Sequence, residues 1–188
     1  MVVDTRVEAM VVMDTEAMNT KVDTEVETVV TIDTVNEKAA ARDPKLRLDF
    51  CIKSLEGHQR SKTAQSLGEL ATASMKNAGK RSRSLEAKAD KILEEKDYGK
   101  NSVLGMVIKD CAMIYKDNAV TLKEAVTSVR VRDYKTAIFV MSSALNATRF
   151  CETRFETRDP PRISPFTRDN EFLTQMILIP LDFTKMLK

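Results

Sequence analysis

A chain of 188 residues, 43% of them hydrophobic and 31% charged, has the size of one domain with a short extension. This length excludes a multidomain enzyme. The longest uninterrupted apolar run has six residues, from Met176 to Leu181, whereas a helix that spans a membrane needs about 20. We therefore expect no membrane-spanning segment.

The first 38 residues differ from the rest of the chain. They hold nine acidic and three basic side chains (net −6), whereas residues 39–188 hold 19 acidic and 27 basic ones (net +8). They also repeat a short apolar-Asp-Thr unit, at residues 3–5, 13–15, 22–24 and 32–34. Acidic, repetitive segments of this kind do not bury enough apolar surface to fold. We expect a disordered tail over residues 1–38 and a folded domain over residues 39–188.

The net positive charge of the folded domain does not indicate a nucleic-acid partner. Its basic residues are scattered among almost as many acidic ones, and the one cluster is Lys80-Arg81-Ser82-Arg83. We interpret that cluster as a solvated helix face, and we expect no nucleic-acid binding.

The distribution of proline and glycine predicts a helical domain. No proline occurs between Pro44 and Pro160, and no glycine occurs between Met106 and Asp159. Apolar residues recur at helical spacing in four stripes, over residues 67–92, 104–129, 134–155 and 172–187. Four long amphipathic helices predict an all-α fold, an up-down-up-down four-helix bundle.

Breaks in the four stripes predict the helix boundaries. Turns are expected at residues 97–100, 130–133 and 159–161. Ser164-Pro165 has the residue types of a helix N-terminus and is predicted to open the last helix. Pro180 lies inside the fourth stripe, where it costs about 3 kcal/mol, so we expect a kink or an early end there.

The chain has three cysteines, and two of them have matching positions. If the second and third helices turn near Val131, Cys111 lies 20 residues before the turn and Cys151 lies 20 residues after it. Both fall on inward stripes, so a disulfide between them is sterically reasonable, with two buried free thiols as the alternative. Cys51 is left over as an unpaired thiol.

An ordered set of short segments resembles the plant invertase and pectin methylesterase inhibitor family, over about residues 40–188. The resemblance is nearest to the invertase-inhibitor branch that includes pollen allergens. It rests on the segments Asp49 to Leu55, Lys109 to Cys111, Tyr115 to Asp117, Arg132 to Tyr134, Met141 to Leu145, Cys151-Glu152 with Phe155, and Ser164 to Thr167 with Asn170. It implies a secreted bundle, preceded by a short helical extension, that blocks the active-site cleft of a carbohydrate-active enzyme. It also implies the Cys111–Cys151 bridge.

The chain departs from this family's pattern in two places near its N-terminus. The cysteine that pairs with the family's equivalent of Cys51 is replaced by Asn36, so we expect a looser N-terminal hairpin. The family's export signal is replaced by the acidic repeat, which lacks the apolar core of a secretory signal. The resemblance implies the apoplast or the vacuole, and the sequence leaves a cytoplasmic location open.

A third departure concerns the target enzyme. Several invertase inhibitors carry Pro-Lys-Phe at the turn into the third bundle helix, where this chain has Tyr134, Lys135 and Thr136. Lys135 suits an acidic glycosidase pocket, while Asp133-Tyr134 is equally typical of pectin methylesterase inhibitors. An ordinary solvated lysine is the alternative at Lys135. We therefore predict possible target contacts at Asp133, Tyr134 and Lys135.

The sequence contains no catalytic constellation. His58 is the one histidine, and no nucleophile or metal-ligand spacing surrounds it, so we expect no enzyme activity, no metal and no cofactor. Asn146-Ala147-Thr148 is an N-glycosylation sequon.

We predict a monomeric protein that inhibits an acid invertase. A pectin methylesterase inhibitor and a bundle that has lost inhibitory activity are the alternatives.

Overall fold

The computed structural model describes residues 32–95, 102–158 and 161–187. Within them it contains α1 (Ile32–Arg42), α2 (Leu48–Glu56), α3 (Gln59–Lys62), α4 (Leu67–Glu95), α5 (Val103–Arg130), α6 (Tyr134–Glu156) and α7 (Thr167–Met186). Residues 1–31 and the turn expected at residues 97–100 lie outside the described residues. None of the described helices is both long enough and apolar enough to cross a membrane.

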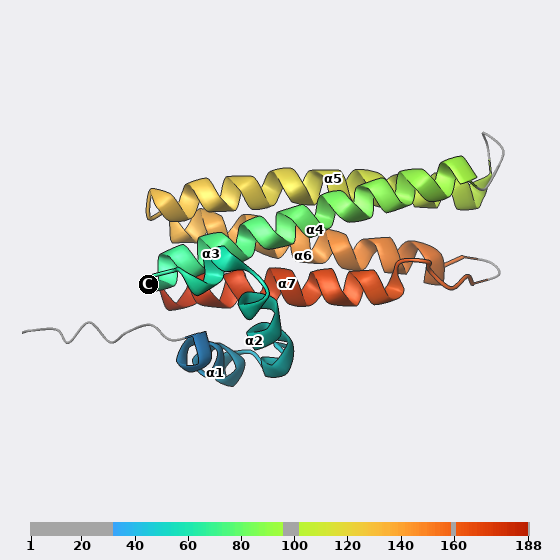
Figure 1. Cartoon of the computed structure of the whole chain (residues 1–188). Coiled ribbons are helices and arrows are strands. Elements are labelled where there is room, and N and C mark those ends of the chain that lie inside the picture. The colour runs from blue at the N-terminus through green and yellow to red at the C-terminus, as the bar shows by residue number, and fades with distance from the viewer. Residues whose placement is uncertain (1–31, 96–101, 159–160, 188) are drawn as a thin grey trace, which may run out of the picture.

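The four long helices form an antiparallel bundle. Each helix packs against two neighbours: α4 and α6 each contact both α5 and α7 (Figure 1). The periodic apolar residues face inward and bury the largest side chains, among them Leu85, Ile108, Leu122 and Met141. This arrangement confirms the predicted all-α, up-down-up-down fold. The turn expected at residues 130–133 is also present, since α5 ends at Arg130 and α6 begins at Tyr134.

A small helical hairpin precedes the bundle. Helices α1 and α2 contact each other and lie against α7, outside the four-helix bundle, and α3 leads into α4 (Figure 1). The helical extension that the family resemblance implies is therefore present. However, α1 begins at Ile32, so residues 32–38 are helical and are not part of a disordered tail. They fold because Val35 and Asn36 are buried in the contact with the rest of the protein.

The last helix begins later than the sequence predicts. Ser164 accepts a hydrogen bond from the Phe166 backbone N–H (3.0 Å), and the helix starts at Thr167 instead of at Ser164-Pro165. Phe166 is fully buried, and its ring meets the rings of Tyr115 and Phe155 edge-on. Burial of this aromatic side chain fixes the point at which the chain enters α7.

Pro180 does not end α7, which excludes the early end, one of the two outcomes that the sequence predicts. The helix continues for six residues beyond it, to Met186. The residues on both sides of the proline are buried: Ile177, Leu178, Ile179, Leu181 and Phe183. Burial of each such side chain stabilises the helix by about 1.5–3 kcal/mol, which together exceeds the proline penalty of about 3 kcal/mol.

A buried carboxylate lies in the second half of α7. Asp182 is 1% exposed and accepts a hydrogen bond from Lys185 Nζ (2.7 Å), while its second oxygen has no partner in the structure. Burial raises the pKa of Asp182, and Asp43 adds to this effect, whereas Lys185 and Arg42 oppose it. The charged form is therefore less stable in the folded protein than in the unfolded chain.

We expect Asp182→Asn to change the pH dependence of stability. Because the folded-state pKa of Asp182 is raised, its destabilising effect is complete above that pKa, decreases as the pH falls below it, and is absent below the lower pKa of the unfolded chain. The substitution removes this effect. The free energy of unfolding of Asp182→Asn minus that of the unchanged protein should therefore be larger at pH 7 than at pH 4.5. Urea unfolding at both pH values measures this difference. An equal difference at both pH values would contradict the assignment.

Candidate functional site

The turn between α5 and α6 has a defined backbone geometry. The Asp133 N–H donates to the Ser128 carbonyl (2.8 Å) and the Arg132 N–H donates to the Val129 carbonyl (3.0 Å). This pair of bonds is the Schellman motif, which requires a left-handed residue after the helix. Arg132 supplies it with φ of 61°, the one positive φ among the described non-glycine residues. The backbone of the turn therefore has a defined shape.

The three predicted target-contact residues have different surroundings at this turn. Asp133 Oδ1 accepts a hydrogen bond from the Thr136 N–H (3.1 Å) and so caps α6. The Thr136 side chain and then this backbone hydrogen bond lower the pKa of Asp133. Tyr134 is half-buried and packs against the core. Lys135 is exposed and forms no side-chain hydrogen bond or ion pair within the described residues. Of the three, Lys135 is the side chain that is free to bind a partner.

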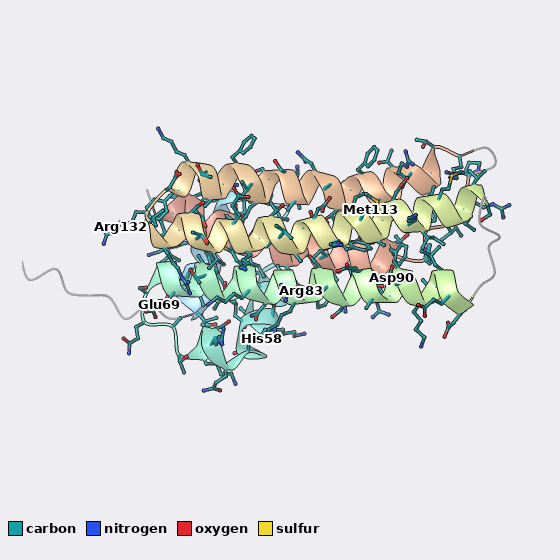
Figure 2. The ribbon with its side chains drawn as sticks, turned by 90° about the horizontal axis from the view of Figure 1, so that it is seen from above. His58, Glu69, Arg83, Asp90, Met113 and Arg132 are labelled. Atoms are coloured by element: carbon teal, nitrogen blue, oxygen red, sulfur yellow. A yellow bond between two sulfur atoms is a disulfide. The ribbon has the colours of Figure 1, made fainter. Side chains whose placement is uncertain are left out.

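Sequence analysis did not identify two other exposed side chains here. Arg130 and Arg132 flank Val131, which is 70% exposed, at the same turn as Lys135. Figure 2 labels Arg132 at this end of the bundle. The turn therefore presents three cations around an apolar side chain, with Asp133 as the one acid. The sequence Arg-Val-Arg-Asp shows the two arginines around the valine. The hydrophobic periodicity, however, indicates only that a helix ends there.

A disulfide joins α5 to α6 far from the turn. Cys111 and Cys151 are both buried, with an S–S distance of 2.08 Å and a Cα–Cα distance of 5.3 Å. This is the pair that the sequence favours. At a rise of 1.5 Å per residue, the bridge lies about 30 Å from the turn. It fixes the two helices against each other at the opposite end of the hairpin.

A polar network, buried at Tyr115 and Asn170, extends this fixation to α7. The Tyr115 hydroxyl donates to Asn170 Oδ1 (2.8 Å) and lies 3.4 Å from Cys151 Sγ. Asn170 Nδ2 and the Thr167 hydroxyl then donate to the two oxygens of Glu152, at 2.5 and 2.7 Å. Burial raises the pKa of Tyr115, so it remains a neutral donor. The network thus connects α5, α6 and α7.

The third cysteine lies in the N-terminal hairpin. The Cys51 thiol forms no disulfide and donates a hydrogen bond to Asn36 Oδ1 (2.7 Å), with both side chains completely buried. Burial raises the pKa of Cys51 to about 12, and Asp182 contributes to the shift. Asn36 therefore contacts the sulfur through a hydrogen bond at the position where the family pattern has a cysteine.

The two remaining candidate positions lie away from the turn. Asn146 is exposed on α6, while Thr148 of the same sequon is buried and hydrogen-bonded to Asn118 (2.9 Å). His58 lies directly before α3 (Figure 2). Within the described parts of the chain, no three His, Cys, Asp or Glu residues are grouped so that they could hold a metal ion.

Comparison with known proteins identifies the family. The model described as plant invertase/pectin methylesterase inhibitor matches residues 32–182. The chain belongs to this family. The match begins at the first residue of α1, so the N-terminal hairpin is part of the family domain.

Individual relatives carry both inhibitor names. A protein of Platanus acerifolia named "Putative invertase inhibitor" is 31% identical over 80% of this chain and 82% of its own length. "Pectinesterase inhibitor 12" of Arabidopsis thaliana is 35% identical over 80% of this chain and 84% of its own length. The crystal structure of a pectin methylesterase inhibitor from Arabidopsis thaliana has the same fold (TM-score 0.57, 18% identity), covering 84% of this chain and 95% of that one. The sequence predicts that this protein is not an enzyme, and membership of a family of inhibitor proteins agrees with that prediction.

We expect Cys51 to resist thiol reagents in the folded protein. With a pKa of about 12, only about one thiol in ten thousand is ionised at pH 8, and the side chain is buried. Titration with Ellman's reagent should detect no fast thiol in the native protein and one after unfolding without reductant. Rapid labelling of the native protein would contradict the buried placement.

We expect Asn36→Cys to form a second disulfide with Cys51, because the present side-chain atoms are 2.7 Å apart. The closed loop has a sequence separation of 15 residues, for which the chain-entropy model gives about 3 kcal/mol of stabilisation. Mass spectrometry should show the bridge, and urea unfolding should show the gain. The control is Asn36→Cys with Cys51→Ser, which has no bridging partner. Equal stability of the two variants would overturn this expectation.

Proposed function

We propose that this protein inhibits a plant acid invertase by inserting the α5–α6 turn into the active-site cleft of the enzyme. The observation that carries the proposal is the unpaired, exposed Lys135 at this turn. Glycosidases of the usual kind hold two carboxyl groups at the reaction centre, which attract a cation. Arg130 and Arg132 add to the positive charge that approaches such a pocket.

Preorganisation of the hairpin supports tight binding. The Cys111–Cys151 bridge, the Schellman motif and the Asp133 cap hold the turn before any partner arrives. A surface that is already ordered loses little conformational entropy on binding. The inhibitor therefore acts by occlusion and performs no chemistry of its own.

Pectin methylesterase is the second candidate target. Two features favour it: Tyr134 replaces the proline of the invertase-inhibitor tripeptide, and a relative at 35% identity is named as a pectinesterase inhibitor. Tyr134 packs against the core, so it contributes to a helix face more than to a projecting loop. A folded bundle without inhibitory activity is the remaining alternative.

The same hypothesis includes a compartment and a modification. A disulfide in a plant protein of this size is typical of the secretory pathway, which agrees with the apoplast or the vacuole. In that pathway Asn146 is a candidate for N-glycosylation. Because Thr148 is buried in the folded protein, attachment would precede folding. We also propose that the protein acts as a monomer, one inhibitor per enzyme molecule.

The test is a parallel inhibition titration of the oxidised full chain against a plant acid invertase and a pectin methylesterase. We expect invertase inhibition, and we expect Lys135→Glu to raise the inhibition constant at least about tenfold, which corresponds to about 1.4 kcal/mol. Lys116→Glu is the matched control, because Lys116 is exposed on α5 away from the turn. It should change the constant by less than about threefold.

Each other outcome has a definite meaning. Inhibition of pectin methylesterase alone would show that pectin methylesterase, and not acid invertase, is the target. Equal effects of the two substitutions would exclude the turn as the contact. Inhibition of neither enzyme by folded, oxidised protein would overturn the inhibitor proposal.

A further inference from the structure

A basic groove runs between α4 and α5 on the face opposite α7. It consists of two adjoining hollows of about 460 and 190 Å³. Figure 2 looks onto α4 and α5 side by side, with Glu69 and Arg83 marking positions along α4. Six basic side chains line what we name the α4–α5 groove: Arg60, Lys76, Lys80, Arg83, Lys123 and Arg130.

The cations of this groove have no partners. Within the described residues, none of the six forms an ion pair or a side-chain hydrogen bond. Glu69 is the one acidic side chain that lines the groove, and it accepts a hydrogen bond from the Gln65 N–H (2.8 Å). The groove therefore has an uncompensated positive charge, which concentrates anions near its surface.

The opposite side of α4 is different. There Arg81 and Lys88 both form ion pairs with Asp169 of α7. The same helix thus pairs its cations toward α7 and leaves them unpaired toward α5. An ordinary solvated helix face would mix acidic and basic side chains, as the rest of this chain does.

The groove cations also act on one another. Lys76 is half-buried, and its pKa is lowered by desolvation and then by the nearby charges of Arg130 and Arg60. Like charges held together in this way reduce stability until an anion binds between them. Ligand binding would relieve that repulsion.

The extent and lining of the groove indicate which anion it fits. The cations extend about 10 Å along each helix, from Lys76 to Arg83 on α4 and from Lys123 to Arg130 on α5. A row of this length suits a polymer with repeating negative charges better than it suits one small ion. The described lining contains no aromatic side chain on which a nucleobase could stack. The Cys111–Cys151 bridge indicates an oxidising compartment, where acidic polysaccharides are the polyanions at hand.

We propose that the α4–α5 groove binds a linear polysaccharide that carries carboxylates, a polyuronate. Binding would hold the protein on the same matrix in which carbohydrate-active enzymes work. The groove shares Arg130 with the α5–α6 turn but does not include Lys135. Its binding is measured without an enzyme and with Arg130 unchanged, so the proposal stands or fails independently of the inhibitor proposal. Recognition would be electrostatic and would weaken steeply as salt concentration rises.

The test measures binding of the oxidised full chain to polygalacturonate and to the same polymer fully methyl-esterified, with no enzyme present. We expect binding only to the charged polymer, and an affinity that falls with salt. The groove variant Lys80→Gln, Arg83→Gln, Lys123→Gln should bind at least about tenfold more weakly. The control variant Lys45→Gln, Lys53→Gln, Arg149→Gln has the same net charge, lies away from the α5 face that carries Lys123, and should bind like the unchanged protein.

All six substituted side chains are exposed, and circular dichroism verifies that both variants remain folded. No binding to polygalacturonate would overturn the proposal. Equal losses in the two variants would show that net charge, and not the groove, is responsible. Equal or tighter binding of a single-stranded RNA of similar length would reject a polyuronate as the ligand class.

Discussion

The buried bond between Cys111 and Cys151 sets the alignment of α5 with α6, and the presentation of the α5–α6 turn depends on that alignment. In an antiparallel pair, a shift of either helix along its axis would move one side of the turn relative to the other. The bridge prevents such a shift from about 30 Å away. The Schellman bonds and the Asp133 cap then define the local shape, so a short segment of loop acquires the rigidity of the bundle.

The other two bundle helices are tied to this hairpin by polar contacts. Tyr115, Asn170 and Glu152 form a partly buried chain of hydrogen bonds from α5 through α7 to α6. Asp169, the neighbour of Asn170, holds Arg81 and Lys88 of α4. The first turn of α7 therefore meets all three other helices. These contacts lie at the disulfide end of the bundle.

The sequence predicts the bundle well because helical periodicity reports burial directly. Leu85, Ile108 and Met141 lie on stripes that the structure buries, and the α5–α6 break falls where the Arg130 to Asp133 segment interrupts them. Positions that depend on tertiary packing are harder. The start of α1 depends on burial of Val35, and the continuation through Pro180 depends on neighbours packed around α7.

The candidate sites show the same limit. Lys135 is recognisable from its place at a predicted turn, whereas the α4–α5 groove combines side chains of α3 and α4 with side chains near the far end of α5. Lys80 and Arg83 alone suggest a solvated surface. Only the packing of α4 against α5 adds Lys123 and Arg130 to them, and only the paired Arg81 and Lys88 show that the groove cations are unusual.

The hydrogen bond between Cys51 and Asn36 has a consequence for oxidative maturation. A chain with three cysteines can form three different single bridges, and two of these would use Cys51. Once the N-terminal hairpin packs, its thiol is buried and almost wholly protonated, so it can neither exchange with the bridge nor join two chains. A single asparagine thus allows the protein to retain an odd cysteine without disulfide-linked aggregation.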